Sequence, residues 1–253
     1  MRITNFYQHA FYIYDSFVAL VSLRNIENVC ERIKMNFNNF ENELVSQSRN
    51  EGTLVEVGSV SYCKEEILGK GSSSAVFKGY FGQRSVAVKR ISVDTKEEKQ
   101  STQREINIII KVDRHPNIVR FFHSESDDDF IFLALELCDG TFYDYFFNAN
   151  EELKLKLQNT ISKEEVFQQV TIGLAHLHKN NIIHRDIKPH NLLISGTNEP
   201  NARVKISDFC LSKIKKTDGP TISSSGVRGT LGWISPEVQL GEKMVTFKFS
   251  DVL

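Results

Sequence analysis

The spacing of apolar residues changes at about residue 58. Before that point apolar side chains recur at steps of three and four, which predicts a helix over residues 26–44. The residues on its apolar face are Ile26, Cys30, Ile33, Phe37, Phe40 and Leu44. An apolar run over residues 11–23 is well short of the ~20 residues that a membrane-spanning helix needs. We therefore expect a helical extension and a polar linker over residues 1–58, in which the helices either pack within this extension or dock on a partner.

Beyond residue 57 apolar and polar positions alternate, as expected for strands that bury one face. Strands are predicted over residues 62–68, 76–81, 84–91, 118–122 and 130–136. A glycine-containing segment over residues 69–76 joins the first two, and Gly82 with Gln83 forms the turn before the third. Residues 96–112 have helical spacing, and the apolar side chains expected on one face are Ile106, Ile109 and Ile110.

The pattern becomes helical after Gly140. The most regular helix is expected over residues 161–179, where the apolar face consists of Val166, Val170, Leu174 and Leu177. Short strands are predicted over residues 182–183, 192–194 and 204–206. This order predicts an α+β protein with two lobes, β-rich over residues 59–138 and helix-rich over residues 139–253. A cleft between two such lobes is a natural nucleotide site.

Composition narrows the class of protein. The 253 residues are 40% hydrophobic and 25% charged with a net charge of -1, which indicates a soluble globular protein of one or two domains. This balance excludes a global attraction to nucleic acid or to an anionic membrane. The cysteines lie far apart, without the spacing of metal ligands, and are Cys30, Cys63, Cys138 and Cys210. They indicate reduced thiols in a cytosolic protein.

One short segment carries most of the candidate chemistry. Residues 184–191 read His-Arg-Asp-Ile-Lys-Pro-His-Asn, and Asp208 follows seventeen residues later. Asp186 can accept a proton from an acceptor hydroxyl, and Lys188 can neutralise a phosphate. Asn191 and Asp208 offer the hard oxygen ligands that Mg2+ prefers. These groups suit the transfer of a phosphoryl group from a nucleotide to a hydroxyl.

A second group of residues surrounds the glycines at 69 and 71. Such a loop lets backbone N–H groups approach phosphate, and its strand–loop–strand context differs from a P-loop, where the glycines lead into a helix. Val76 and Ala87 on the flanking strands are small and apolar, suited to cover a purine. Lys89 closes the third strand, and Glu105 lies sixteen residues later on the predicted helix, where the two can pair.

These motifs together resemble the eukaryotic protein kinase family from about residue 58 onward. They occur in family order: residues 69–76, Val-Ala-Val-Lys at 86–89, Glu105, His115-Pro116-Asn117, residues 184–191, Asp208-Phe209, and Ser235-Pro236-Glu237. Within that family, residues 136–138, 173–178, 184–191 and 226–237 are similar to the inositol-requiring kinase/endoribonucleases of the unfolded protein response, and His190 is among the more specific matches.

The resemblance implies a role for each matching residue. Lys89 and Glu105 form an ion pair, Asp186 is the catalytic base with Lys188 beside it, and Asn191 and Asp208 bind Mg2+. The residues expected around ATP are Leu68, Gly69, Lys70, Gly71, Val76, Ala87, Lys89, Leu135, Glu136, Cys138 and Leu193. Leu135 is the implied gatekeeper, and the stacked regulatory column consists of Ile109, Phe121, His184 and Phe209.

The resemblance also implies how the protein acts. It predicts a serine/threonine kinase that uses ATP and Mg2+ and phosphorylates its own activation segment at Ser223, Ser224 and Ser225. Expected partners are a protein substrate and either a second copy or a full-length homologue. No direct contact with nucleic acid, no membrane span and a cytoplasmic location are expected of this chain.

Two departures from the family pattern leave an alternative open. Cys210 replaces the glycine that follows Asp208-Phe209, and glycine permits backbone conformations that a Cβ disfavours. The last residues resemble the opening of the long central helix of the second lobe, so an incomplete lobe is expected. The alternative is a truncated or inactive kinase that binds nucleotide and regulates a full-length kinase/ribonuclease.

Overall fold

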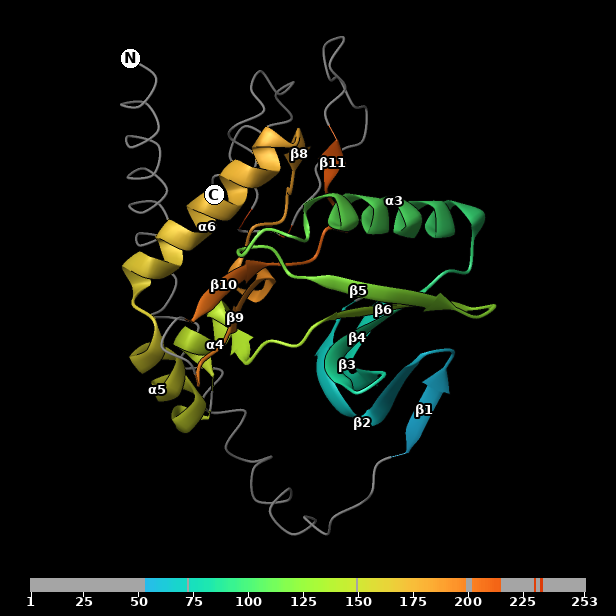
Figure 1. Cartoon of the computed structure of the whole chain (residues 1–253), viewed down its shortest axis with the longest axis horizontal. Coiled ribbons are helices and arrows are strands. Elements are labelled where there is room, and N and C mark those ends of the chain that lie inside the picture. The colour runs from blue at the N-terminus through green and yellow to red at the C-terminus, as the bar shows by residue number, and fades with distance from the viewer. Residues whose placement is uncertain are drawn as a thin grey trace. The chain divides into compact units, whose positions relative to one another are not determined.

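The computed structural model describes residues 53–71, 73–148, 150–198 and 202–214, together with Thr230 and Trp233 (Figure 1). The predictions for residues 1–52 lie outside the described residues. So do the three candidate phosphorylation sites and the Ser235-Pro236-Glu237 motif. No helix within the described part of the chain is long and apolar enough to cross a membrane.

Six antiparallel strands form a curled sheet in the order β1-β2-β3-β4-β6-β5 (Figure 1). Their bounds are Leu54–Val57, Val60–Lys70, Ser74–Phe81, Arg84–Ser92, Phe121–Ser126 and Phe130–Glu136 for β1 to β6. The sheet begins at Leu54, slightly earlier than the change of pattern at Val57 predicts. β1 and β2 pair from Leu54↔Cys63 to Val57↔Val60, so a short hairpin, too brief to show clear alternation, was missed.

Alternation along β4 assigns its side chains to two faces of the sheet. Val86 and Val88 are fully buried in an apolar cluster with Tyr62, Phe77 and Phe132. Ala87 and Lys89 therefore lie on the opposite face, where the neighbouring apolar cluster packs against Ile106 of the following helix. The sheet thus directs a lysine out of its main core and toward that helix.

The helix α3, Lys96–Val112, has the predicted bounds and begins with a capping box formed by Thr95 and Glu98. Its predicted apolar face was partly wrong, because Ile110 is 52% exposed and Ile108 is buried instead. The buried side chains are Thr102, Glu105, Ile106, Ile108, Ile109 and Val112. The true face is therefore centred on Glu105 and Ile109, and it carries an acidic side chain into the interior.

The second half of the described chain is mainly helical. Its helices are α4 (Phe142–Phe147), α5 (Glu151–Thr160), α6 (Lys163–Lys179) and the 3-10 turn η1 (Pro189–Asn191). Its strands are β7 (Gly140–Thr141), β8 (Ile182–Ile183), β9 (Leu192–Ser195), β10 (Arg203–Ile206) and β11 (Lys213–Ile214), in sheets β10-β9-β7 and β11-β8. The four predicted apolar residues of α6 are all buried. The α+β, two-lobed fold class is confirmed.

The segment between α3 and β5 joins the two halves. A strand was predicted over residues 118–122, but β5 begins at Phe121 because Ile118 forms an isolated parallel bridge with Ile206 of β10 instead. Asn117, which is 3% exposed, donates from its side chain to the carbonyl of Val204 at 3.0 Å. Gly173 lets α6 pack closely against Asn117, since a Cβ at position 173 would lie 3.1 Å from the carbonyl oxygen of Asn117.

Candidate active site

The sheet and α3 bring Lys89 and Glu105 together in the interior. Lys89 Nζ lies 2.8 Å from Glu105 Oε1 and 3.0 Å from Asp208 Oδ1. Lys89 is 6% exposed and Glu105 is 8% exposed, so their pairing removes the large cost of burying either charge alone. Three residues predicted from distant motifs therefore meet at one ammonium group.

Charge and burial act in opposite directions on this cluster. Burial on its own would lower the pKa of Lys89, but the carboxylates of Glu105 and Asp208 outweigh it and raise that pKa well above its ordinary value. Burial would likewise raise the pKa of Asp208, but Lys89 beside it holds that pKa well below the ordinary value. Both groups are therefore charged at neutral pH, as phosphate and cation binding require.

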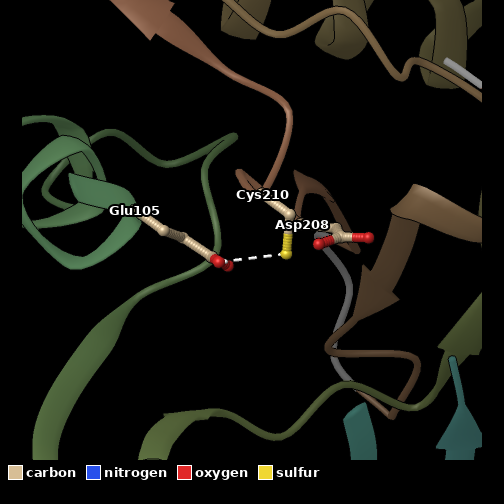
Figure 2. Close-up of side chains that lie close together, drawn as sticks. All are labelled: Glu105, Asp208 and Cys210. Carbon is tan, nitrogen blue, oxygen red and sulfur yellow. Dashed lines mark hydrogen bonds between the residues drawn. The ribbon is translucent and has the colours of Figure 1, made fainter. Parts of the chain in front are cut away.

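Cys210 completes the cluster, and its position answers a question left open by the sequence. Lys89 Nζ donates to Cys210 Sγ at 3.0 Å. Cys210 Sγ in turn donates to Glu105 Oε2 at 3.0 Å (Figure 2). Among the described residues with positive φ, Asp208 is present at 65° and Cys210 is absent. The left-handed residue of this turn is thus the aspartate, and the Cβ of Cys210 causes no backbone strain.

A second cluster forms around Asp186 in the segment that leads into η1. Asp186 is 6% exposed, and its Oδ2 accepts from Asn191 Nδ2 at 2.9 Å and lies 2.8 Å from Lys188 Nζ. The Asn191 side chain also donates to the backbone carbonyl of Asp186 at 2.8 Å. The turn at Pro189 brings Asn191 back toward Asp186, five residues earlier in the chain. The Asn191 side chain can therefore hold the Asp186 carboxylate.

Thr230 lies in the candidate site, although the sequence analysis assigned it no role there. Its Oγ1 donates to Asp186 Oδ1 at 2.7 Å, and its backbone N–H donates to the same oxygen at 3.2 Å. Lys188 Nζ donates to Thr230 Oγ1 at 2.7 Å. Its sequence signal was its place in residues 229–233, which are similar to the kinase/endoribonucleases. That similarity does not indicate a contact with Asp186, forty-four residues earlier.

Buried contacts fix the backbone on both sides of these clusters. His184 is fully buried, contacts Ser207 O through Nε2 at 2.9 Å and packs edge-on against Phe209. Arg185 has a φ of 68° and donates from Nε to Leu211 O at 2.6 Å. Ser207 N–H donates to Asn191 O at 2.9 Å, which connects the Asp186 cluster to the strand that leads to Asp208. The two clusters therefore belong to one site.

Three of the residues predicted to surround a purine, Val76, Ala87 and Leu135, lie on the same face of the six-stranded sheet as Lys89. In the register of β3, β4 and β6, Val76 lies opposite Lys89, and Ala87 lies opposite Leu135. Val76, Ala87 and Leu135 are partly buried, as is Leu193 on β9, whereas Leu68 is 51% exposed. Gly69 and Lys70 end β2, and Gly71 N–H donates to Ser74 O at 2.7 Å.

The connection after β6 contains Glu136 and Cys138. Glu136 pairs with Lys205 at 3.0 Å and accepts from Ser195 at 3.4 Å, so this carboxylate is committed to protein contacts. Its backbone N–H donates to Arg120 O at 2.9 Å, and the backbone contact with a purine stays a prediction. Burial raises the pKa of Cys138 to about 12, with a further contribution from Glu136, so the thiol stays neutral. The described cysteines, Cys63, Cys138 and Cys210, are all unpaired, as predicted.

Asn191 and Asp208 have the chemistry of ligands for a hard cation. The Asn191 amide nitrogen is engaged by Asp186, which assigns its oxygen as the ligand atom. Asp208 is ionised, and its side chain is 37% exposed, so it is open to solvent. One amide oxygen and one carboxylate, joined through Ser207, form an oxygen donor set that suits Mg2+.

Comparisons with known proteins agree with this arrangement. The family model described as "Protein kinase domain" matches residues 62–252. Similar proteins are the Serine/threonine-protein kinase/endoribonuclease ire-1 of Caenorhabditis elegans, 39% identical over 74% of this chain, and IRE2 of Homo sapiens, 38% identical over 73%. The Sensor for unfolded proteins in the ER ire1 of Schizosaccharomyces pombe is 33% identical over 70%.

The matched region covers 19%, 19% and 17% of these three relatives. The chain thus spans about a fifth of their length, and the endoribonuclease in their names is said of them alone. The family prediction made from the motifs is confirmed. The chain belongs to the protein kinase family and, by these relatives, is of the serine/threonine type.

Proposed function

We propose that this chain transfers the γ-phosphate of ATP, bound with Mg2+, to serine and threonine hydroxyls of proteins, within signalling that responds to unfolded proteins. Protein kinase domains use ATP with a divalent metal ion. The observation that carries the proposal is the buried Asp186 carboxylate, held by Asn191, Lys188 and Thr230 and connected through Ser207 to the Lys89 cluster.

Different residues of the chain would have different roles in the transfer of the phosphoryl group. Three hydrogen-bonding neighbours fix the Asp186 carboxylate, so it can orient an incoming hydroxyl and accept its proton without reorganising. Lys188 would neutralise charge on the phosphoryl group near that carboxylate, and Lys89 would bind the phosphates nearer the purine. Asn191 and Asp208 would hold Mg2+, which neutralises the phosphate oxygens.

The expected acceptors include the chain itself. Ser223, Ser224 and Ser225 lie in sequence between Asp208 and Thr230, both of which are in the site, so this segment is tethered at each end to it. We propose that these serines are phosphorylated by a second copy. The name of the fission yeast relative, a sensor for unfolded proteins, supports the signalling role. We also propose a cytosolic location, as the widely spaced cysteines of the sequence indicate.

Replacing Asp186 with Asn tests the proposal with little change of shape. Asp186→Asn is expected to lower kcat at least ~100-fold, because the group that accepts the proton is lost, with a KM for ATP close to the parent value. Lys89→Ala is expected to raise the KM for ATP and lower kcat. The measurement is transfer of radiolabelled phosphate from ATP to a protein substrate.

Asp94→Asn is the matched control, since Asp94 is exposed and its carboxylate accepts from the nearby Ser92 hydroxyl, away from both clusters. It should keep the parent rate. An Asp186→Asn chain that transfers phosphate as fast as the control would exclude Asp186 as the base. Binding of ATP without any transfer by the parent chain would instead favour a nucleotide-binding module.

A further inference from the structure

Cys210 is the one member of the Lys89 cluster for which neither the reaction nor the family supplies a role. The residue is exposed as a whole, but its sulfur points toward Glu105 (Figure 2) and also contacts Lys89. Glu105 comes from α3, Lys89 from β4, and Cys210 from the turn after β10. One thiol therefore connects three segments that are far apart in the sequence.

The contacts around Lys89 form a ring in which Lys89, Cys210 and Glu105 each contact the other two. Lys89 Nζ contacts Glu105 Oε1, Asp208 Oδ1 and Cys210 Sγ, and Cys210 in turn donates to Glu105 Oε2. Both oxygens of Glu105 are thus held, one by the ammonium and one by the thiol. A glycine at position 210 has no side chain and would leave the second oxygen without this donor.

The backbone adds a second effect. Cys210 is outside the left-handed region in this arrangement, so its Cβ fits. A glycine would gain access to left-handed conformations that a cysteine disfavours, and it would therefore spread the turn over more alternatives. Side chain and backbone both favour the arrangement in which Asp208 lies beside Lys89.

We propose that Cys210 is a positioning residue that ties the turn carrying Asp208 to the Lys89–Glu105 pair and holds this arrangement before nucleotide binds. The inference deepens the proposed function, because Lys89 and Asp208 are the groups expected to meet the nucleotide. Cys210 acts through them and touches no substrate. A thiol suits this position because it donates to Glu105 while accepting from Lys89.

Three substitutions in the full chain separate the two effects. Cys210→Ser keeps a donor and a Cβ, Cys210→Ala keeps only the Cβ, and Cys210→Gly loses both. We expect the KM for ATP to rise about threefold in the alanine variant and further in the glycine variant, with kcat within about twofold of the parent. The serine variant should restore most of the loss. Cys63→Ala is the matched control, since the Cys63 thiol donates to the exposed Glu65 on β2, outside the Lys89 cluster.

A double-mutant cycle in the absence of nucleotide tests the inference without relying on phosphate transfer. Cys210→Ala should lower the equilibrium constant for folding about threefold to tenfold in the parent and much less when Glu105 is already alanine. Lys89→Met provides a second cycle if the Glu105 variant fails to fold. The measurement is chemical denaturation followed by fluorescence.

Three results would overturn the inference. The first is a pair of cycles in which the effects of the two substitutions on folding simply add. The others are a serine variant whose KM for ATP is as high as that of the alanine variant, or a glycine variant with the parent's KM for ATP. A parent chain that binds ATP but transfers no phosphate would remove the proposed kinase activity. In that case the denaturation cycles, together with nucleotide affinity in place of KM, still decide the role of Cys210.

Discussion

At the scale of single residues, two glycines in the same sheet meet opposite surroundings. A Cβ at Gly79 would collide with Ser61 O and lie 2.7 Å from Val88 Cγ2, because β2 and the main core press on it from both sides. A Cβ at Gly69 would have nothing within 4 Å, and Gly69 is absent from the described residues with positive φ. Packing therefore requires glycine at 79 but not at 69.

Gly69→Ala is accordingly expected to leave the free energy of unfolding within ~0.5 kcal/mol of the parent. If this loop binds the phosphates as proposed, the added methyl group should weaken ATP binding about threefold or more. Gly79→Ala should lower the free energy of unfolding by ~1–3 kcal/mol or more through overpacking. Denaturation and nucleotide titration measure the two effects. Unchanged ATP affinity in Gly69→Ala would place the phosphates elsewhere.

The predictability of the site also differs residue by residue. Lys89, Asp186, Asn191 and Asp208 could be named as candidates because each lies in a short motif, and Glu105 could be named from its place on the helix predicted after Lys89. Thr230 could not be assigned a partner, since its contact with Asp186 depends on how a long segment returns to the site. The inward position of the Cys210 thiol likewise depends on a backbone dihedral angle at Asp208 that no residue pattern reveals.

At the scale of elements, a pair of histidines joins α6 to the loop after α3. The rings of His115 and His176 stack with centroids 4.3 Å apart. Burial lowers the pKa of both, and His176 lowers that of His115 further, while Lys205 and Lys179 add positive charge nearby. Protonating either ring in the folded chain is thus harder than in the unfolded chain, whose histidines have the ordinary value of 6.5.

This difference predicts a loss of stability in acid. As pH falls through 6.5 toward the lowered folded pKa values, the unfolded state binds more protons than the folded state, so the free energy of unfolding falls. His176→Phe keeps an aromatic ring but cannot be protonated, and it should flatten this dependence between about pH 7.5 and 5. Denaturation at several pH values measures it. Parallel curves for parent and variant would contradict the assignment.

Element boundaries were predicted well where one face is uniformly buried and poorly where contacts from another sheet intervene. The bounds of α3 follow from its cap and its periodicity. The start of β5 was misplaced because Ile118 pairs with Ile206, a contact between residues eighty-eight positions apart. A local pattern does not contain that information, since Ile118 and Val119 are as apolar as strand residues.

At the scale of the described molecule, residues 117–119 link the six-stranded sheet and α3 to α6 and β10. Asn117 donates to Val204 O and to Gln169 Oε1, and it accepts from Ile206 N–H. Val119 N–H donates to Ile206 O at 3.0 Å. These hydrogen bonds cross from one half to the other, so we expect the two halves to unfold together.

Asn117→Ala is expected to lower the free energy of unfolding by ~1–3 kcal/mol, because the carbonyl of Val204 loses its buried side-chain donor. It should also broaden the denaturation curve as the two halves separate. Asn107→Ala is the matched control, since Asn107 is exposed on α3 and contacts Gln103. A loss no greater than the control's would exclude this link.

The left-handed backbone at Arg185 and Asp208 has a further consequence. Each of these non-glycine residues holds a conformation that costs roughly 1–2 kcal/mol, and one directly precedes the candidate base while the other is a candidate cation ligand. Glycine at position 185 would relax the chain and loosen the backbone that orients Asp186, whereas glycine at position 208 would remove the candidate cation ligand itself. Thermal stability and turnover therefore place opposite demands on the backbone at these two residues. A variant selected for thermal stability alone is expected to lose turnover through changes at these positions.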